Sequence, residues 1–198
     1  MTVSDDDIAA AADAIRTGGL VVYPTETVYG VGADALDPVA IERVFETKRR
    51  SRDDPLSFAF PDVDSALEHV RVGETERAFM RAFLPGPVTV VCEKRDSVPA
   101  VLTGGRDRVG VRVPDHDVAL ALLEHVAPIT ATSANVSGRG SVTDPVDLGD
   151  DFRDAVDVVL DAGETPGTES TVVDVARGEV LREGANADAI REWLAEHG

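Results

Sequence analysis

The sequence predicts a single α/β domain, residues 1–198, built on a mixed sheet. Hydrophobic residues make up 43% of the 198 positions, which is enough to bury one sizeable core. Short apolar runs rich in valine alternate with helical patterns, but not in a strict strand–helix–strand order. The sheet is therefore expected to mix parallel and antiparallel strands.

The helices are predicted from their start and stop signals. Ser4 is a good N-cap, three aspartates follow it, and Gly18 ends that helix. Asp37 and Pro38 begin a second helix, which runs toward Lys48. Further helices are predicted over residues 64–70, 74–83, 115–125 and 188–194.

The strands are predicted from short β-rich apolar runs. The run at 20–23 is expected to be buried on both faces, and Pro24 ends it because proline has no N–H to donate. Residues 25–32, TETVYGVG, are expected to form a loop, and residues 138–151 a mobile surface loop. The other strands are predicted over residues 56–60, 88–92, 109–113, 129–132, 156–160, 170–175 and 180–182.

The chain is strongly acidic. Its net charge is -18, from 37 Asp and Glu against 19 Lys and Arg. Such a surface repels phosphate backbones, so broad nucleic-acid binding is disfavoured. Only Lys48 and Lys94 are lysines. Lysine scarcity with an excess of carboxylates suggests adaptation to a salty cytosol, and an acidic protein of an ordinary cytosol is the alternative.

A cytoplasmic location is expected. No run of residues approaches the apolar length of a membrane span, and the acidic N-terminus lacks the basic segment of a signal peptide. The single cysteine, Cys92, excludes an internal disulfide, and its apolar neighbours favour a buried core thiol.

Several familiar motifs are absent from the sequence. It contains neither the GxxxxGK[ST] P-loop nor the GxSxG nucleophile elbow, and Gly30-Val31-Gly32 lacks the third glycine of a dinucleotide fingerprint. The four histidines show no metal-ligand spacing.

Polar residues instead collect where predicted strands end. Thr25 and Thr27 flank Glu26 just after the first strand, and their hydroxyls suit the polar groups of an amino acid. Ordinary turn chemistry explains these hydroxyls equally well. Because open α/β sheets bind ligands at strand ends, similar residues elsewhere gain weight. They are Arg112, Ser133, Asn135, Glu169, Ser170, Thr171 and Arg182.

Residues 48–52, KRRSR, place four cations within five positions. Cations favour the C-terminal end of a helix for electrostatic reasons alone. In so acidic a chain, however, the cluster is conspicuous, and we expect it to clamp a polyphosphate, Arg by its planar fork and Lys as a point charge.

In their order along the chain, these residues resemble the motifs of the YrdC/TsaC threonylcarbamoyl-AMP synthase family over nearly the whole length. The resemblance rests on the order of several motifs, because none of them is specific alone. The motifs are YPTETVYGVG from Tyr23, KRR from Lys48, DPL from Asp54, PGPVT from Pro85, GVRVP from Gly110, SANVSG from Ser133, ESTVVD from Glu169 and LREG from Leu181.

The resemblance implies a twisted, open α/β sheet with flanking helices around a deep cationic cavity. It implies the conversion of L-threonine, bicarbonate and ATP into threonylcarbamoyl-AMP, pyrophosphate and water, with magnesium accompanying ATP. A separate transfer complex would then modify tRNA, and direct tRNA binding by this chain is expected to be weak or absent.

The resemblance also implies site residues by motif position. Thr27, Arg112 and Ser170 would hold threonine, with Arg112 pairing with the carboxylate. Lys48 and Arg50 would stabilise charge on the phosphates during the displacement. We expect Glu26 to orient an amine or a metal-bound water, and no metal ligand among the side chains is assigned. The implied nucleotide ligands are Lys48, Arg50, Arg108, Ser133, Asn135, Ser141 and Arg182.

Three departures from the family pattern matter. Ala59 stands where the family often has a histidine at the threonine end of the pocket, so contacts there are expected to be lost or replaced. Ser51 follows the K-x-R element in place of proline, which should loosen the clamp. The chain ends after the catalytic-type domain, so residues 138–151 are expected to cover the site, or the site stays open.

Two other functions remain open on the sequence. One is an RNA-binding or ribosome-maturation module of the same fold, with a basic mouth around Arg49 and Arg52; the net charge of -18 argues against it. The other is a carbamoyl-adenylate activity, like that of related domains in hydrogenase-maturation carbamoyltransferases. The lack of an acylphosphatase or zinc region argues against this second function.

Overall fold

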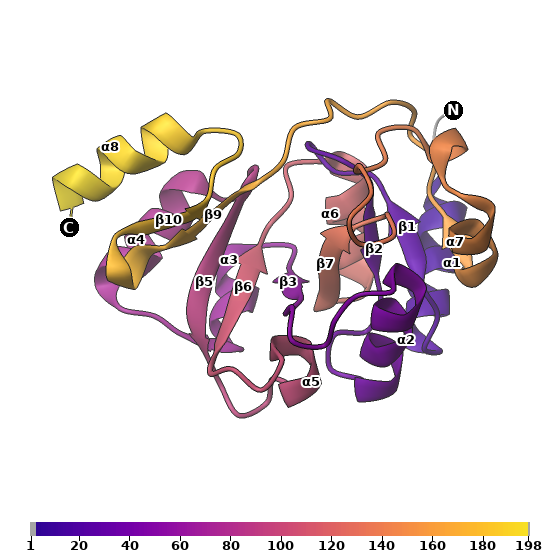
Figure 1. Ribbon diagram of the computed structural model, residues 1–198, viewed down its shortest axis with the longest axis horizontal. Coiled ribbons are helices and arrows are strands. Elements are labelled where there is room, and N and C mark those ends of the chain that lie inside the picture. The colour runs from indigo at the N-terminus through magenta and orange to yellow at the C-terminus, as the bar shows by residue number, and fades with distance from the viewer. Residues whose placement is uncertain (1–2, 198) are drawn as a thin grey trace.

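A computed structural model describes residues 3–197 of the protein, and these residues form one ten-stranded sheet flanked by helices (Figure 1). The strands are β1 (Val21–Tyr23), β2 (Gly30–Gly32), β3 (Ser57–Ala59), β4 (Val70–Arg71), β5 (Val88–Lys94), β6 (Arg108–Arg112), β7 (Ile129–Ser133), β8 (Val158–Val159), β9 (Thr171–Asp174) and β10 (Glu179–Arg182). The α-helices are α1 (Asp5–Arg16), α2 (Pro38–Lys48), α3 (Val63–Leu67), α4 (Glu74–Phe83), α5 (Ala100–Thr103), α6 (Asp117–His125), α7 (Asp150–Ala155) and α8 (Ala187–His197). The 3₁₀ turns are η1 (Pro145–Asp147) and η2 (Val175–Arg177).

The sheet is mixed and open, which confirms the predicted fold class. Its strand order is β10-β9-β5-β6-β3-β7-β2-β1-β8, and β4 pairs with β5. The pairs β3–β6, β5–β9 and β1–β8 are parallel, and the others are antiparallel. Helices α4 and α8 lie at one end of the sheet and α1, α2 and α7 at the other, so the central strands are left to build the site (Figure 1).

Helix α1 starts as its sequence predicts. The Ser4 hydroxyl accepts a hydrogen bond from the Asp7 backbone N–H, and the Asp7 carboxylate accepts one from the Ser4 backbone N–H. This reciprocal capping satisfies two donors that the first helical turn leaves free. The helix buries Ile8, Ala12 and Ile15 against the sheet.

The segment predicted as one loop after β1 contains a strand, which corrects that prediction. Gly30–Gly32 forms β2 and pairs antiparallel with β1. A Cβ on Gly30 would lie 3.0 Å from the Tyr23 ring, and one on Gly32 would lie 2.9 Å from the Ile129 side chain. The glycines are therefore needed for close packing under Tyr23 rather than for a flexible exit.

Two further boundaries differ from the predictions. The helix expected over 64–70 ends at Leu67, because Val70 joins β4 and pairs with Lys94. Residues 138–151, expected as a mobile surface loop, contain η1 and the start of α7 and bury Val142 and Leu148. Their apolar side chains attach this segment to the core, which a polar composition concealed.

The core is large enough to hold the sheet rigidly. Leu20 and the three residues of β1 are at most 2% exposed, as expected for a strand buried on both faces. Cys92 is fully buried, and burial raises the pKa of its thiol to about 12, which confirms a core role. At the far end, Trp193 of α8 packs against Phe79 of α4 with ring centroids 5.1 Å apart.

None of the helices between residues 3 and 197 combines the length and apolar composition that crossing a bilayer requires.

Candidate active site

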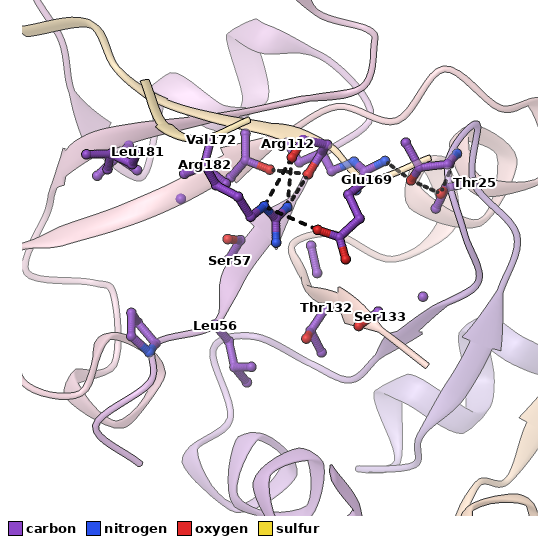
Figure 2. Close-up of a pocket in the computed structure, with 18 of the residues that line it drawn as sticks. Thr25, Leu56, Ser57, Arg112, Thr132, Ser133, Glu169, Val172, Leu181 and Arg182 are labelled. Atoms are coloured by element: carbon purple, nitrogen blue, oxygen red, sulfur yellow. Dashed lines mark hydrogen bonds and ion pairs between the residues drawn. The ribbon is translucent and has the colours of Figure 1, made fainter. Parts of the chain in front are cut away.

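A cavity of about 550 Å³ lies over the central strands, and eight strands contribute residues to its lining. Figure 2 shows Arg182 and Glu169 on one side of it and Thr132 and Ser133 on another. Eight of the sequence-predicted site residues line this cavity. They are Thr27, Arg50, Arg108, Arg112, Ser133, Ser141, Ser170 and Arg182.

The cavity concentrates cations in an otherwise acidic chain. Six arginines line it, against only two acidic residues, Glu169 and Asp174. Cavities walled by one sign of charge focus the field and attract ligands of the opposite sign. The cavity therefore favours an anionic ligand, although the whole chain carries a charge of -18.

Arg112, at the end of β6, organises one end of the cavity. Its Nη2 donates to Glu26 Oε1 at 2.9 Å and to Thr27 Oγ1 at 2.7 Å. The side chains of Arg112 and Glu26 are each only 14% exposed. Burial strengthens the attraction between the two charges but also removes their hydration, so either charge is costly when it is alone.

The hydroxyls beside Arg112 form a directed chain. Thr25 Oγ1 donates to the Val28 carbonyl at 2.7 Å and lies 2.8 Å from Thr27 Oγ1. Because each hydroxyl has one proton, Thr27 must donate to Thr25 while it accepts from Arg112. Thr27 Oγ1 therefore offers a ligand one remaining lone pair, and no proton.

Burial also affects Tyr23, which is another lining residue of the cavity. Burial raises the pKa of its hydroxyl to about 12, while Arg112 lowers the pKa and Glu26 raises it. The phenol is therefore protonated at neutral pH and is not a proton acceptor there.

Ser170 and Arg182 form a second wall. Arg182 donates to the Ser170 carbonyl at 2.8 Å and to its Oγ at 2.9 Å, and Thr89 Oγ1 lies 3.3 Å from the same Oγ. Glu169 lies 3.8 Å from the Arg182 guanidinium (Figure 2). The β9–β10 pairing thus holds an arginine and a hydroxyl together over the cavity.

Arg108 is tied down in the same part of the site. It donates to Asp174 Oδ1 at 2.8 Å and to the Val91 carbonyl at 2.7 Å, and Asp174 is almost completely buried. Arg177 approaches the other Asp174 oxygen at 3.6 Å. Sequence reasoning missed Arg177, Asp174 and Arg106 as lining residues. Asp174 ends the ESTVVD motif, which could have indicated it, whereas Arg106 and Arg177 had only the signal of an arginine near a strand end in a chain with few cations.

The cationic run at 48–52 does not form one clamp. Arg49 adopts a left-handed conformation with φ 49°, which ends α2 and turns the chain. As a result Arg49 pairs with Asp151 at 3.0 Å and Arg52 with Glu42 at 2.7 Å, both on the exposed surface. Of these cations only Arg50 lines the cavity. The expectation of a four-cation clamp is therefore wrong.

Lys48 lies behind the cavity wall, not in the wall. The residue is 1% exposed, and its ammonium donates to the Ser133 carbonyl, to the Asn135 carbonyl at 2.8 Å and to Asn135 Oδ1 at 3.3 Å. Three oxygens match the three donors of an ammonium, so none remains for a phosphate. In this arrangement Lys48 and Asn135 hold the 133–137 loop in place, and Ser133 reaches the cavity.

The environment of Lys48 affects its charge. Burial, together with the nearby Arg50 cation, lowers the pKa of Lys48 to about 7. Burial also lowers the pKa of Arg50, which has Asp54 and Arg182 as charged neighbours. Arg50 is oriented through its bonds to the Asp54 and Pro55 carbonyls, at 3.0 and 3.2 Å.

Ala59 lies in β3 beside Arg112, its register partner in β6, and is 1% exposed. It belongs to the core and is not a lining residue of the cavity. Among residues 3–197, no group of three or more His, Cys, Asp or Glu side chains is placed to hold a metal ion.

Comparison with known proteins identifies the family. The Sua5/YciO/YrdC family model, described as "Telomere recombination", matches residues 13–184. A Pyrococcus abyssi protein named threonylcarbamoyl-AMP synthase is 46% identical over 172 residues, which are 85% of this chain and 50% of that protein. A Bacillus subtilis protein of the same name is 38% identical over 181 residues, which are 89% of this chain and 52% of that protein.

The fold agrees with that match. The crystal structure of Pyrococcus abyssi Sua5 complexed with L-threonine superposes with a TM-score of 0.91 at 40% identity, and covers 100% of this chain and 60% of the other. The chain spans about half the length of the two curated relatives. From the family match, the identities and the shared fold, the chain belongs to the Sua5/YciO/YrdC family.

Proposed function

We propose that this domain is an L-threonylcarbamoyladenylate synthase, a nucleotidyltransferase. It would convert L-threonine, bicarbonate and ATP into threonylcarbamoyl-AMP, pyrophosphate and water. The observation that carries the proposal is one cavity that combines two kinds of polar lining group. Arg112 and Thr27 suit an amino acid, and the other arginines of the lining suit a polyphosphate.

The relatives support the choice of substrate. The Pyrococcus abyssi and Bacillus subtilis relatives are named threonylcarbamoyl-AMP synthase, and the structure of Pyrococcus abyssi Sua5 complexed with L-threonine superposes over the whole chain. Arg112 would pair with the substrate carboxylate, and Ser170, which lines the same cavity, would be a further contact for threonine. The one free lone pair of Thr27 would accept a hydrogen bond from a substrate donor.

The described residues favour catalysis by positioning and charge neutralisation. The threonine amine, once neutral, attacks bicarbonate, and the carbamate formed attacks the α-phosphorus of ATP. Arg50, Arg108 and Arg182 would stabilise the charge that develops on the phosphates as pyrophosphate leaves. Magnesium would enter with ATP as part of the substrate, since no acidic cluster in residues 3–197 is placed to hold it.

The role of Lys48 differs from the one its motif position implies. All three of its ammonium donors face loop oxygens, so we assign Lys48 to positioning the 133–137 loop. Ser133 would then be presented to the nucleotide, and Arg50 would be the direct phosphate ligand of the K-x-R element.

The reaction consumes ATP and bicarbonate, so we place it in the cytoplasm. The product is a labile mixed anhydride, which a separate transferase would pass on to tRNA. The net charge of -18 disfavours direct tRNA binding by this chain and, with it, the RNA-binding alternative.

The test is incubation of the protein with ATP, magnesium, bicarbonate and L-threonine, at low and at high salt. Pyrophosphate release and an adenylate of threonine's carbamate are expected, and omission of threonine or bicarbonate should abolish both. Pyrophosphate release that does not depend on threonine at either salt concentration would refute the proposal.

A further inference from the structure

Glu26 forms an ion pair with Arg112, the residue whose guanidinium would bind the substrate carboxylate in the proposed function. Resting on that function, we propose that Glu26 is a catalytic residue: the substrate carboxylate displaces it from Arg112, and it then accepts the proton of the substrate ammonium.

Only one of the two carboxylate oxygens of Glu26 has a hydrogen-bond partner within residues 3–197. Oε1 accepts from Arg112 Nη2 at 2.9 Å, whereas Oε2 is buried and has no hydrogen-bond partner within residues 3–197. Arg112 Nε is likewise buried without a partner in that range. A buried carboxylate oxygen and a buried guanidinium N–H left unpaired are each costly. The pair is therefore ready to exchange partners when a ligand offers better ones.

An α-amino acid offers both groups. Its carboxylate can form the paired contact with Arg112 that a guanidinium fork prefers, which releases Glu26. Its ammonium is attached one carbon away from the carboxylate, so it enters beside the released Glu26. The paired sites of opposite charge thus select a zwitterion over a simple carboxylic acid.

Thr27 defines the donor side of that zwitterion. Its hydroxyl already donates to Thr25 and accepts from Arg112, so its remaining lone pair can only accept. A substrate ammonium or hydroxyl satisfies this lone pair, and a carboxylate oxygen does not. The substrate is therefore oriented with its donors toward Thr27 and Glu26.

The proton transfer balances without another reactant. One N–H bond of the ammonium breaks, its electron pair stays on nitrogen, and the proton moves to the Glu26 carboxylate. The products are a neutral amine and a carboxylic acid. The amine then attacks bicarbonate, which the proposed reaction already supplies, and gives the carbamate and water.

Neighbouring titratable groups are less suited to accept this proton. Arg112, Tyr23 and His116 are the ionisable groups that interact with Glu26. Arg112 is already a cation, and Tyr23, with its pKa raised to about 12, stays protonated. Burial lowers the pKa of His116, and its Nδ1 accepts from the Val118 backbone N–H at the start of α6.

The experiment is a pH profile of threonine-dependent pyrophosphate release by the wild type and Glu26→Gln, with Glu26→Asp as the conservative variant. At pH 7, Glu26→Gln should lower kcat by about a hundredfold, the size of a lost proton acceptor. Its kcat should then rise about tenfold per pH unit toward pH 9, because only free amine reacts. The wild-type profile should be flatter, and Glu26→Asp should restore part of kcat.

A matched control is Glu192→Gln on α8, because Glu192 is exposed and is not a lining residue of the cavity; its profile should equal the wild type. Thermal unfolding of the Glu26 variants checks that they are folded, and cooperative transitions are expected. A Glu26→Gln enzyme with unchanged kcat and pH slope, and only a higher KM for threonine, would overturn the proton-acceptor role. An inactive wild type would instead overturn the proposed function itself.

Discussion

Two polar segments of this chain behave in opposite ways. Residues 25–27 and Arg112 are 85 or more positions apart, yet they meet in one bonded cluster at the end of the cavity. Residues 48–52 are adjacent in sequence, yet their side chains separate into the interior, the cavity and two surface ion pairs. A high density of charge along a chain is therefore weak evidence that the residues share a site. Side-chain hydrogen bonds join the loop after β1 to the end of β6, although three strands separate β1 from β6 in the sheet, and one left-handed residue, Arg49, divides the second group.

The largest expected effect tests the first segment. Arg112→Ala should lower kcat/KM for threonine by about a thousandfold, because it removes the carboxylate partner and leaves Glu26 buried without one. Arg112→Lys should recover only part of this loss, since an ammonium lacks the planar fork. Steady-state kinetics with threonine varied at saturating ATP measure both. A loss that appeared in the KM for ATP alone would contradict the assignment of Arg112 to the threonine carboxylate.

The next effect tests the division of the cationic run. Arg50→Ala should raise the KM for ATP by about thirtyfold, because it removes a charge-assisted phosphate contact of about 2 kcal/mol. Arg49→Ala and Arg52→Ala are matched controls from the same run, and their activity should stay within about twofold of wild type. Exposed ion pairs contribute at most about 1 kcal/mol. Equal losses of activity in all three variants would show that Arg49, Arg50 and Arg52 bind the phosphates together.

Lys48 is expected to show a smaller effect on nucleotide use and a larger effect on stability. Lys48→Met keeps the side-chain length but removes the ammonium donor from the Ser133 and Asn135 carbonyls, of which Ser133 keeps the Asn135 backbone N–H, so the free energy of unfolding should fall by about 2 kcal/mol and the KM for ATP should rise about tenfold. Lys48→Arg should not rescue either, since a planar group cannot point three donors at converging oxygens. Denaturant unfolding and ATP kinetics measure these outcomes.

The pH dependence of the free energy of unfolding, compared between the wild type and Lys48→Met, tests whether burial lowers the pKa of Lys48. The folded-state pKa of Lys48 is lowered to about 7 from an ordinary value of 10.5, so between these values the unfolded chain binds more protons. The cost of burying the charge is thus present below pH 7 and is relieved as the pH rises. The stability of the wild type relative to Lys48→Met should increase from pH 7 to pH 10. A constant difference would show that the carbonyls keep Lys48 fully charged.

The smallest expected effect is that of salt, and of the exposed cations Arg49 and Arg52, on the free energy of unfolding. We propose that the charge of -18 makes the protein salt-adapted, so the free energy of unfolding should rise between low and molar salt as self-repulsion is screened. The double variant Arg49→Ala/Arg52→Ala should be less stable than wild type by about 0.5 kcal/mol at low salt, and by less at high salt. Urea unfolding at both salt concentrations measures this. A wild type whose stability ignores salt would contradict the adaptation.

Most of the secondary structure could be predicted from local signals. The capped start of α1, the Pro38 start of α2 and the whole of α4 follow from residues within a few positions. Strand β2 could not be predicted, because its two glycines are typical of a turn and only contact with Tyr23 makes them strand residues. The same holds for β4, which exists because Val70 finds a partner in β5.

The candidate site was predictable to a similar degree. Motif order led to eight lining residues, including Thr27 and Arg112. It could not show that Lys48 faces the loop and not the cavity, because a motif records which residues recur and not where a side chain points. Arg106 and Arg177 were missed since neither belongs to a quoted motif.

The sequence by itself determined the mixed α/β class, the family resemblance and the identities of the polar residues, because these depend on local propensity and on motif order. Only the tertiary structure decided which of those residues share a cavity and in which direction their protons point. The tertiary fold brings the loop after β1 to the end of β6, so that Arg112 bonds Glu26 and Thr27 across more than eighty residues, and the left-handed turn at Arg49 sends neighbouring cations apart. Both outcomes depend on long-range packing, which no window of sequence contains.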